Sequence, residues 1–176
     1  MIAIFLFVGL VGYTGYDIES GLKAGEKVPE LKAFGLVGDV KDKAADFAKE
    51  RGELPTVYLF VNAAKFDRPI ARYMKELDQK AGDTADKVQM VAVWVGGDLD
   101  ANKTQIPRIN QSLKFDRTAM AVFEGDATGP NGWGLNSDAH LTTIVVHKGK
   151  VIKSFAYQSA NDKDVPKVLE ELKKAK

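Results

Sequence analysis

Short apolar runs along the chain have the length and composition of buried β-strands. They are rich in β-branched and aromatic side chains, and polar or turn-forming residues bound them. The runs span residues 55–61, 88–95, 119–123, 141–146 and 151–157. The last two runs are joined by His147-Lys148-Gly149-Lys150, a connection with glycine at the turn. The pattern therefore predicts three separate strands followed by a β-hairpin.

Helical periodicity is clearest after the first of these runs. Four apolar residues recur there at the spacing i, i+3, i+4, i+7, namely Ile70, Tyr73, Met74 and Leu77. Asp67 precedes them as an N-cap, and Pro69 lies in the first turn, where a missing N–H is tolerated. A similar stripe at Val165, Val168, Leu169 and Leu172 predicts a C-terminal helix that opens at Asp164.

The remaining segments carry weaker signals. Residues 102–113 read as a helix that Pro107 interrupts, which predicts two short pieces. Asp39 is expected to cap a short helix that runs through Phe47 and stops at Gly52. Residues 21–34 are expected to be extended, and residues 125–136 form a loop dense in Gly, Asn and Asp.

The order of these elements predicts the fold class. Strands that alternate with helices favour parallel pairing with right-handed crossovers, and the terminal hairpin adds antiparallel strands at one side. The expected architecture is an α/β fold with a mixed β-sheet flanked by helices on both faces. We expect one domain, residues 17–176, preceded by a separate apolar segment, residues 1–16.

Residues 2–13 form the most apolar stretch of the chain. The stretch is shorter than the roughly 20 residues of a membrane-spanning helix, and its length matches the core of a secretory signal peptide. No Lys or Arg precedes it and no A-x-A site follows it. The segment is interpreted as a signal remnant, an anchor or an assembly arm. The alternative is an apolar arm or strand that packs on the domain or on a neighbouring subunit.

Charge and cysteine content exclude several classes of function. Twenty-five Lys and Arg are interleaved with 24 Asp and Glu, so no basic surface for nucleic acid is expected. The chain has no cysteine, which removes disulfides, thiolate nucleophiles and Cys-based metal sites together. With only two histidines, His140 and His147, we expect neither a metal site nor a cofactor.

Three segments resemble the thioredoxin superfamily, in particular its AhpC/TSA or TlpA-like redoxin branch. GEKVPELKAF resembles the branch's entry segment, and LPTVYLFVNAAKFDRPIARYMKELD resembles its first core strand, active-site loop and long helix. HLTTIVVHKGKVIKSFAY resembles its closing hairpin. The resemblance covers residues 24–175 and implies a thioredoxin-like fold.

The sequence departs from that branch where the chemistry is carried out. The loop that would hold Cys-x-x-Cys or a single peroxidatic cysteine reads Asn62-Ala63-Ala64-Lys65-Phe66-Asp67-Arg68-Pro69. The superfamily's cis-proline would fall near Thr142, so the resemblance puts the usual clamp on a substrate peptide in doubt. No catalytic residue is therefore predicted, and thiol redox activity of the family type is excluded.

The same loop is nevertheless a candidate ligand site. It lies at a helix N-terminus, where free N–H groups with Lys65 and Arg68 could hold an anion. Against this, Asp67 caps the helix and repels an anion. Asn62 and Thr142 complete the set of candidate ligand-binding residues.

Trp133, among glycines, is either a binding contact or a side chain that folds back onto the core. Asp98, Asp100 and Asn102 imitate the start of a calcium loop but are better explained as helix capping.

Three functions follow from these observations. The first is a non-catalytic thioredoxin-like protein for binding or assembly, which contacts a protein partner, a second copy or a membrane through residues 2–13. The second is a small-ligand-binding protein or non-thiol enzyme that uses the former active-site loop. The third is a chaperone-like domain that holds extended peptides along the sheet edge. The apolar segment favours an exported or cell-envelope location, with the cytoplasm as the alternative.

Overall fold

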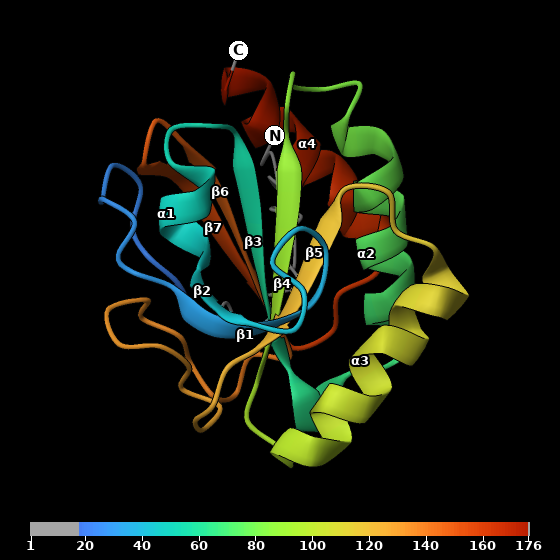
Figure 1. The fold of residues 1–176 in the computed structure, drawn as a ribbon. Coiled ribbons are helices and arrows are strands. Elements are labelled where there is room, and N and C mark those ends of the chain that lie inside the picture. The colour runs from blue at the N-terminus through green and yellow to red at the C-terminus, as the bar shows by residue number, and fades with distance from the viewer. Residues whose placement is uncertain (1–17, 176) are drawn as a thin grey trace, which may run out of the picture.

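The computed structural model describes residues 18–175, which form one mixed β-sheet covered on both faces (Figure 1). The strands are β1 Lys32–Val37, β2 Ala44–Asp46, β3 Thr56–Asn62, β4 Gln89–Val95, β5 Thr118–Val122, β6 Leu141–His147 and β7 Lys150–Tyr157. The α-helices are α1 Phe47–Arg51, α2 Arg68–Ala81, α3 Leu99–Leu113 and α4 Val165–Leu172. Short 3₁₀ turns at Ala63–Lys65, Asp162–Asp164 and Lys173–Ala175 complete the elements.

The strand order across the sheet is β2-β1-β5-β4-β3-β6-β7. The central strands β3, β4 and β5 run parallel, joined by α2 and α3, while β6 and β7 pair antiparallel at one side. The predicted mixed sheet with a terminal hairpin is confirmed. The hairpin turn places Lys148 and Gly149 at positive φ, 51° and 67°, as a tight two-residue connection requires.

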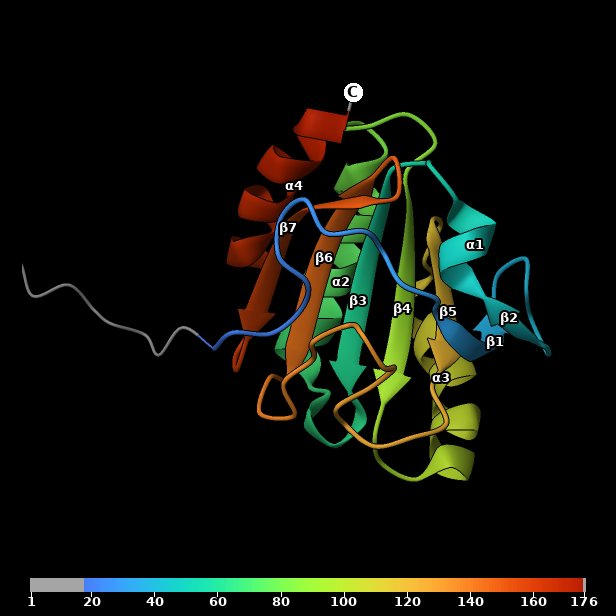
Figure 2. The same cartoon turned by 90° about the vertical axis from the view of Figure 1, so that its left-hand side faces the viewer.

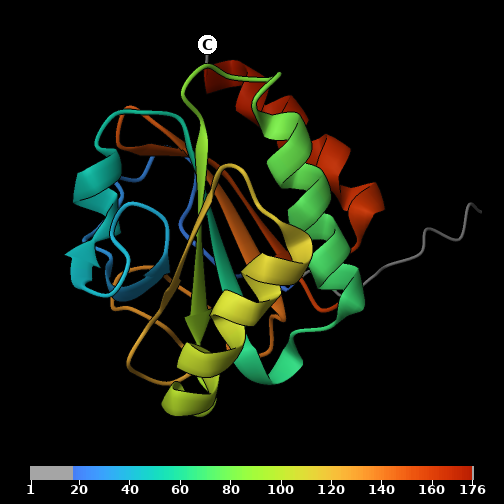
Figure 3. The same cartoon turned by 45° about the vertical axis from the view of Figure 1, so that its right-hand side comes forward.

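Helices α2, α3 and α4 cover one face of the sheet (Figure 3). Their apolar residues share a core with alternate residues of the central strands, and the predicted stripe Ile70, Tyr73, Met74 and Leu77 is fully buried. The opposite face is covered by the one-turn-long α1, the entry segment before β1 and the loop between β5 and β6 (Figure 2). Helices therefore lie on both faces, as predicted.

Near the N-terminal side, one sequence-based prediction is wrong and another is incomplete. The helix does not begin at Asp39: residues 44–46 form β2, and Asp46 caps α1 by accepting the N–H groups of Ala48 and Lys49. Strand β1, which pairs with both β2 and β5, was expected only as extended chain. Strand β1 pairs with the distant strand β5, and β2 forms by pairing with β1; local periodicity reveals neither pairing.

Helix α3 is continuous, so the predicted break at Pro107 is also wrong. Asp98 caps the start of the helix and accepts the N–H of Ala101 at 2.7 Å. Ile106 is fully buried against the core, and this packing offsets the backbone hydrogen bond that Pro107 cannot donate. Among the described residues, no helix is both long and apolar enough to cross a bilayer. Residues 2–13 and the expected domain boundary at residue 16 lie outside the described residues.

Candidate functional site

The candidate site lies where β3 ends and α2 begins, at the edge formed by the carboxyl ends of the parallel strands. This edge is the usual location of ligand sites in open α/β sheets. Asn62 is the last residue of β3, the 3₁₀ turn Ala63–Lys65 follows, and Asp67 precedes α2. The loop therefore presents four of the predicted residues, Asn62, Lys65, Asp67 and Arg68, within one short stretch.

Asn62 uses its polar groups to hold two loops together. Its side-chain Nδ2 donates to the carbonyl of Ser137 at 3.0 Å, and its Oδ1 accepts the N–H of Ala64 at 3.2 Å. Its backbone N–H donates to the carbonyl of His140 at 3.0 Å. Only 6% of the residue is exposed, so its amide supports the local backbone.

Asp67 is the N-cap of α2. Its carboxylate accepts the N–H of Ile70 at 2.9 Å, and Pro69 has no N–H to offer, so the first turn has few free donors. Lys65 and Arg68 are exposed, and neither forms an ion pair with any residue in the range 18–175. The two cations are thus free to meet an anion from solution, although the helix terminus itself is already capped.

An aromatic pair fills the space beneath this loop, and sequence reasoning missed it. Phe66 packs its ring against Trp94 of β4, with ring centroids 5.6 Å apart and planes at 59°. Trp94 is 2% exposed, and Phe66 is partly buried in the same core cluster. The loop is therefore packed onto the sheet by an aromatic side chain, which leaves its polar tips at the surface.

Thr142 lies on the other face of the sheet from α2. It pairs with Phe60 in the ladder between β3 and β6, and its hydroxyl forms a 2.6 Å hydrogen bond with that of Ser20. The next residue, Thr143, faces α2 and meets the hydroxyl of Tyr73 at 2.9 Å. The side chain of Thr142 is therefore bonded to the entry segment on the face opposite α2, and not to the loop that carries Lys65 and Arg68.

Trp133 takes the second of its two expected roles and folds back onto the core. Its side chain is fully buried, and its Nε1 donates to the carbonyl of Glu30 at 3.0 Å. Its ring lies 5.0 Å from that of Tyr58 and 4.8 Å from that of Phe60. Trp133 therefore belongs to the core on the sheet face opposite α2, beneath the loop between β5 and β6. Its side chain has no exposed surface for a ligand to touch.

The buried tyrosines stay neutral at ordinary pH. Burial raises the pKa of Tyr73 well above its usual value, and the nearby Tyr157, with its ring centroid 5.7 Å away, adds to the effect. Burial likewise raises the pKa of Tyr58 and of Tyr157. None of the three is therefore poised as a base or nucleophile near neutral pH.

The residues considered for metal binding have other roles in the structure. Asp98 caps α3, and Asn102 donates from Nδ2 to the carbonyl of Gly96 at 2.9 Å. His140 and His147 lie at the two ends of β6. Within residues 18–175, no three His, Asp or Glu side chains gather closely enough to hold a metal ion.

Solved structures share this architecture, although no protein-family model and no curated protein matches the sequence. Peroxidoxin BcpB from Mycobacterium tuberculosis superposes with a TM-score of 0.63 at 15% identity, over 88% of this chain and 99% of that chain. A putative thiol:disulfide interchange protein DsbE from Chlorobium tepidum gives 0.61 at 16% identity, over 88% and 98%. The exposed lipoprotein thioredoxin from Streptococcus pneumoniae gives 0.54 at 14% identity, over 81% and 99%.

The chain therefore has the thioredoxin-like fold of the redoxins, as its sequence pattern predicts. Redoxin chemistry needs a thiolate that attacks a peroxide or exchanges a disulfide. This chain has no cysteine, so it cannot supply that thiolate. In the loop between β3 and α2, the side chains of Asn62 and Asp67 are bonded to the local backbone.

Proposed function

We propose that this chain is a non-catalytic thioredoxin-like domain that binds a protein partner or assembles with a second copy. The observation that carries the proposal is the state of the former active-site loop. It has no thiol, its Asn62 and Asp67 are occupied by structural hydrogen bonds, and Phe66 anchors it to the sheet. A loop built in this way maintains the fold and its surface without offering a reactive group.

The proposal assigns the partner contact to residues 2–13, which lie outside the described residues. Twelve consecutive uncharged and mostly apolar residues would be costly to leave in water, so we expect a protein surface or a membrane to cover them. The location proposed is the cell envelope. One similar structure, the thioredoxin from Streptococcus pneumoniae, is described as an exposed lipoprotein, which is compatible with that location.

The test compares the full chain with a variant that lacks residues 1–16. Light scattering coupled to size-exclusion chromatography, together with membrane fractionation, reports size and association in each case. We expect the full chain to form a defined complex, oligomer or membrane-bound fraction that the truncated chain does not form. Lys65→Ala with Arg68→Ala is the matched control, since it alters the former active-site loop and leaves the apolar segment intact. Identical size and fractionation of the two chains would refute the assignment of the contact to residues 2–13.

A second candidate function rests on Lys65 and Arg68, which are exposed and unpaired with any described acid. They could hold a small anion or an anionic metabolite beside the capped start of α2. Thermal shift with phosphate, sulfate, citrate and ATP tests this function. Lys80→Ala is the control, because Lys80 is an exposed cation at the opposite end of the same helix. Only stabilisation that Lys65→Ala or Arg68→Ala removes, and Lys80→Ala retains, supports this function.

A further inference from the structure

Strand β7 ends the sheet, and most of its outer edge carries no backbone partner. The entry segment pairs only with its start: the N–H of Gly25 donates to the carbonyl of Val151 at 2.8 Å, and the N–H of Val151 donates to Glu26 at 2.9 Å. From residue 152 to residue 157, no described backbone outside the β6–β7 hairpin bonds to this edge. Unpaired N–H and C=O groups of this kind are a template for another strand.

A groove of about 580 Å³ follows this open edge. Residues 18–24 of the entry segment form one wall, residues 153–157 of β7 form the floor, and Lys167 of α4 contributes from the other side. Figure 2 shows β7 lying between the entry segment and α4. The hydroxyl of Ser154 donates to the carbonyl of Leu22 at 2.6 Å, which fixes the entry segment beside the strand. The groove thus has the form of a slot along a strand edge.

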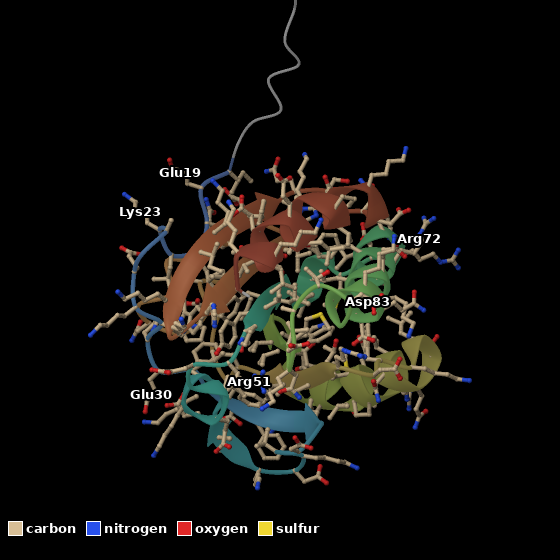
Figure 4. All side chains as sticks on the ribbon, turned by 90° about the horizontal axis from the view of Figure 1, so that it is seen from above. Glu19, Lys23, Glu30, Arg51, Arg72 and Asp83 are labelled. Atoms are coloured by element: carbon tan, nitrogen blue, oxygen red, sulfur yellow. The ribbon has the colours of Figure 1, made fainter. Side chains whose placement is uncertain are left out.

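The chemistry of the groove is aromatic and cationic. Phe155 and Tyr157 are half-buried, with parallel rings whose centroids are 6.4 Å apart. Three lysines, Lys23, Lys153 and Lys167, line the groove against a single acid, Glu19. Figure 4 shows Glu19 and Lys23 projecting outward from the entry segment.

These lysines are poorly neutralised by the protein itself. Lys167 reaches Asp164 at 4.0 Å, the outer limit of an ion pair. Lys23 and Lys153 form no ion pair within residues 18–175. The groove therefore carries an excess of positive charge, although the chain as a whole has a net charge of only +1.

We propose that the β7 edge binds an extended acidic segment of a partner protein, which adds a strand to the sheet. Main-chain hydrogen bonds to residues 152–157 would supply affinity, and carboxylates that meet Lys153 and Lys167 would supply specificity. A second copy of this chain is disfavoured, because pairing two β7 edges brings like-charged lysines into one sheet. The inference rests on the proposed binding function and names the chemistry of the partner.

The probe for this site is a fluorescein-labelled peptide of seven alternating Val and Glu residues with blocked ends. Fluorescence anisotropy with the full chain should show saturable binding that weakens as salt increases. The double variant Lys153→Glu/Lys167→Glu should bind about tenfold more weakly, since two screened ion pairs become repulsive. Lys43→Glu/Lys49→Glu is the matched control. It makes the same charge change at exposed sites near the opposite end of the sheet and should bind like wild type.

A second arm tests the strand geometry without altering the protein. One peptide is methylated at the backbone nitrogens of its odd-numbered residues, and a second at those of its even-numbered residues. Only one of these two sets faces β7 in a paired strand, so only one peptide loses the donors that reach the edge. We expect only that peptide to lose binding, and we expect the amide NMR shifts to move at residues 152–157. Equal binding of both methylated peptides, equal binding of a Val/Lys peptide, or no binding to wild type would each overturn the inference. A dimer that the probe dissociates would overturn it in favour of a second copy.

The outcomes separate this inference from the proposed function on which it rests. If the full chain forms its complex and the Val/Glu probe does not bind at β7, the β7 site is refuted and the binding function stands. If the full chain behaves like the chain without residues 1–16 and the probe still binds at β7, the assignment to residues 2–13 fails and the edge site stands.

Discussion

Asp78 is a fully buried carboxylate on α2, and its loss should destabilise the fold more than that of any surface acid. Its Oδ2 accepts the N–H of Asp116 at 2.9 Å, and its Oδ1 accepts the N–H of Arg117 at 2.9 Å. Oδ1 also accepts the hydroxyl of Thr118 at 2.7 Å. One side chain thus fixes the connection between α3 and β5 to α2, some 40 residues away in sequence.

The expected magnitude follows from the three donors that Asp78→Ala leaves without an acceptor. A buried unsatisfied donor costs about 1–3 kcal/mol. Asp116 and Arg117 are otherwise exposed, so water relieves part of the cost for their N–H groups, while Thr118 is buried. We expect a loss of about 3–4 kcal/mol in the free energy of unfolding. Asp78→Asn keeps one acceptor oxygen but turns an NH₂ group toward a donor, and about 2 kcal/mol is expected.

Urea denaturation followed by far-UV circular dichroism measures these changes. With a slope of about 2 kcal/mol per molar urea, Asp78→Ala should lower the midpoint by about 1.5–2 M. Gln79→Ala is the control, because Gln79 is the exposed next residue of the same helix and should shift stability by less than about 0.5 kcal/mol. A midpoint for Asp78→Ala equal to that of Gln79→Ala would refute the reasoning.

Three further predictions follow from the buried polar and aromatic groups. Trp133→Ala removes the ring between Tyr58 and the loop and should cost about 3–5 kcal/mol in urea unfolding, whereas Trp133→Phe should cost distinctly less. Because burial raises the pKa of Tyr58 and Tyr73, stability is full below about pH 10 and falls as pH rises through the folded pKa values. Absorbance at 295 nm should show these tyrosines ionising only as the protein unfolds; ionisation in the folded state would contradict this. Asn62→Ala should increase proteolysis between residues 125 and 139 at a cost of about 2 kcal/mol, and an unchanged cleavage rate would argue against the role of Asn62.

The loop between β3 and α2 could be placed from the sequence, because its neighbours carry strong local signals. The buried run that became β3 and the capped, amphipathic start of α2 bracket it on both sides. The function of its residues was less accessible. Asn62 finds Ser137 only because β3 and β6 are adjacent, and Phe66 finds Trp94 only because β3 and β4 are paired.

Trp133 and Thr142 show the same limit. A tryptophan among glycines looks alike in sequence whether it binds a ligand or covers a core, and its burial depends on Tyr58 and Phe60 on a distant strand. Thr142 follows the hairpin's entry in sequence, yet the alternation of a strand turns its side chain away from α2 and toward Ser20.

The sequence by itself determined the absence of thiol chemistry, the order of the central strands and helices, and the redoxin-like pattern, because composition and local periodicity carry that information. Only the tertiary structure decided the β1–β2 pairing, the continuity of α3 through Pro107 and the burial of Asp78 and Trp133. It also revealed the open, lysine-lined edge of β7. These features arise from tertiary contacts and strand pairing, whose energies no local pattern contains.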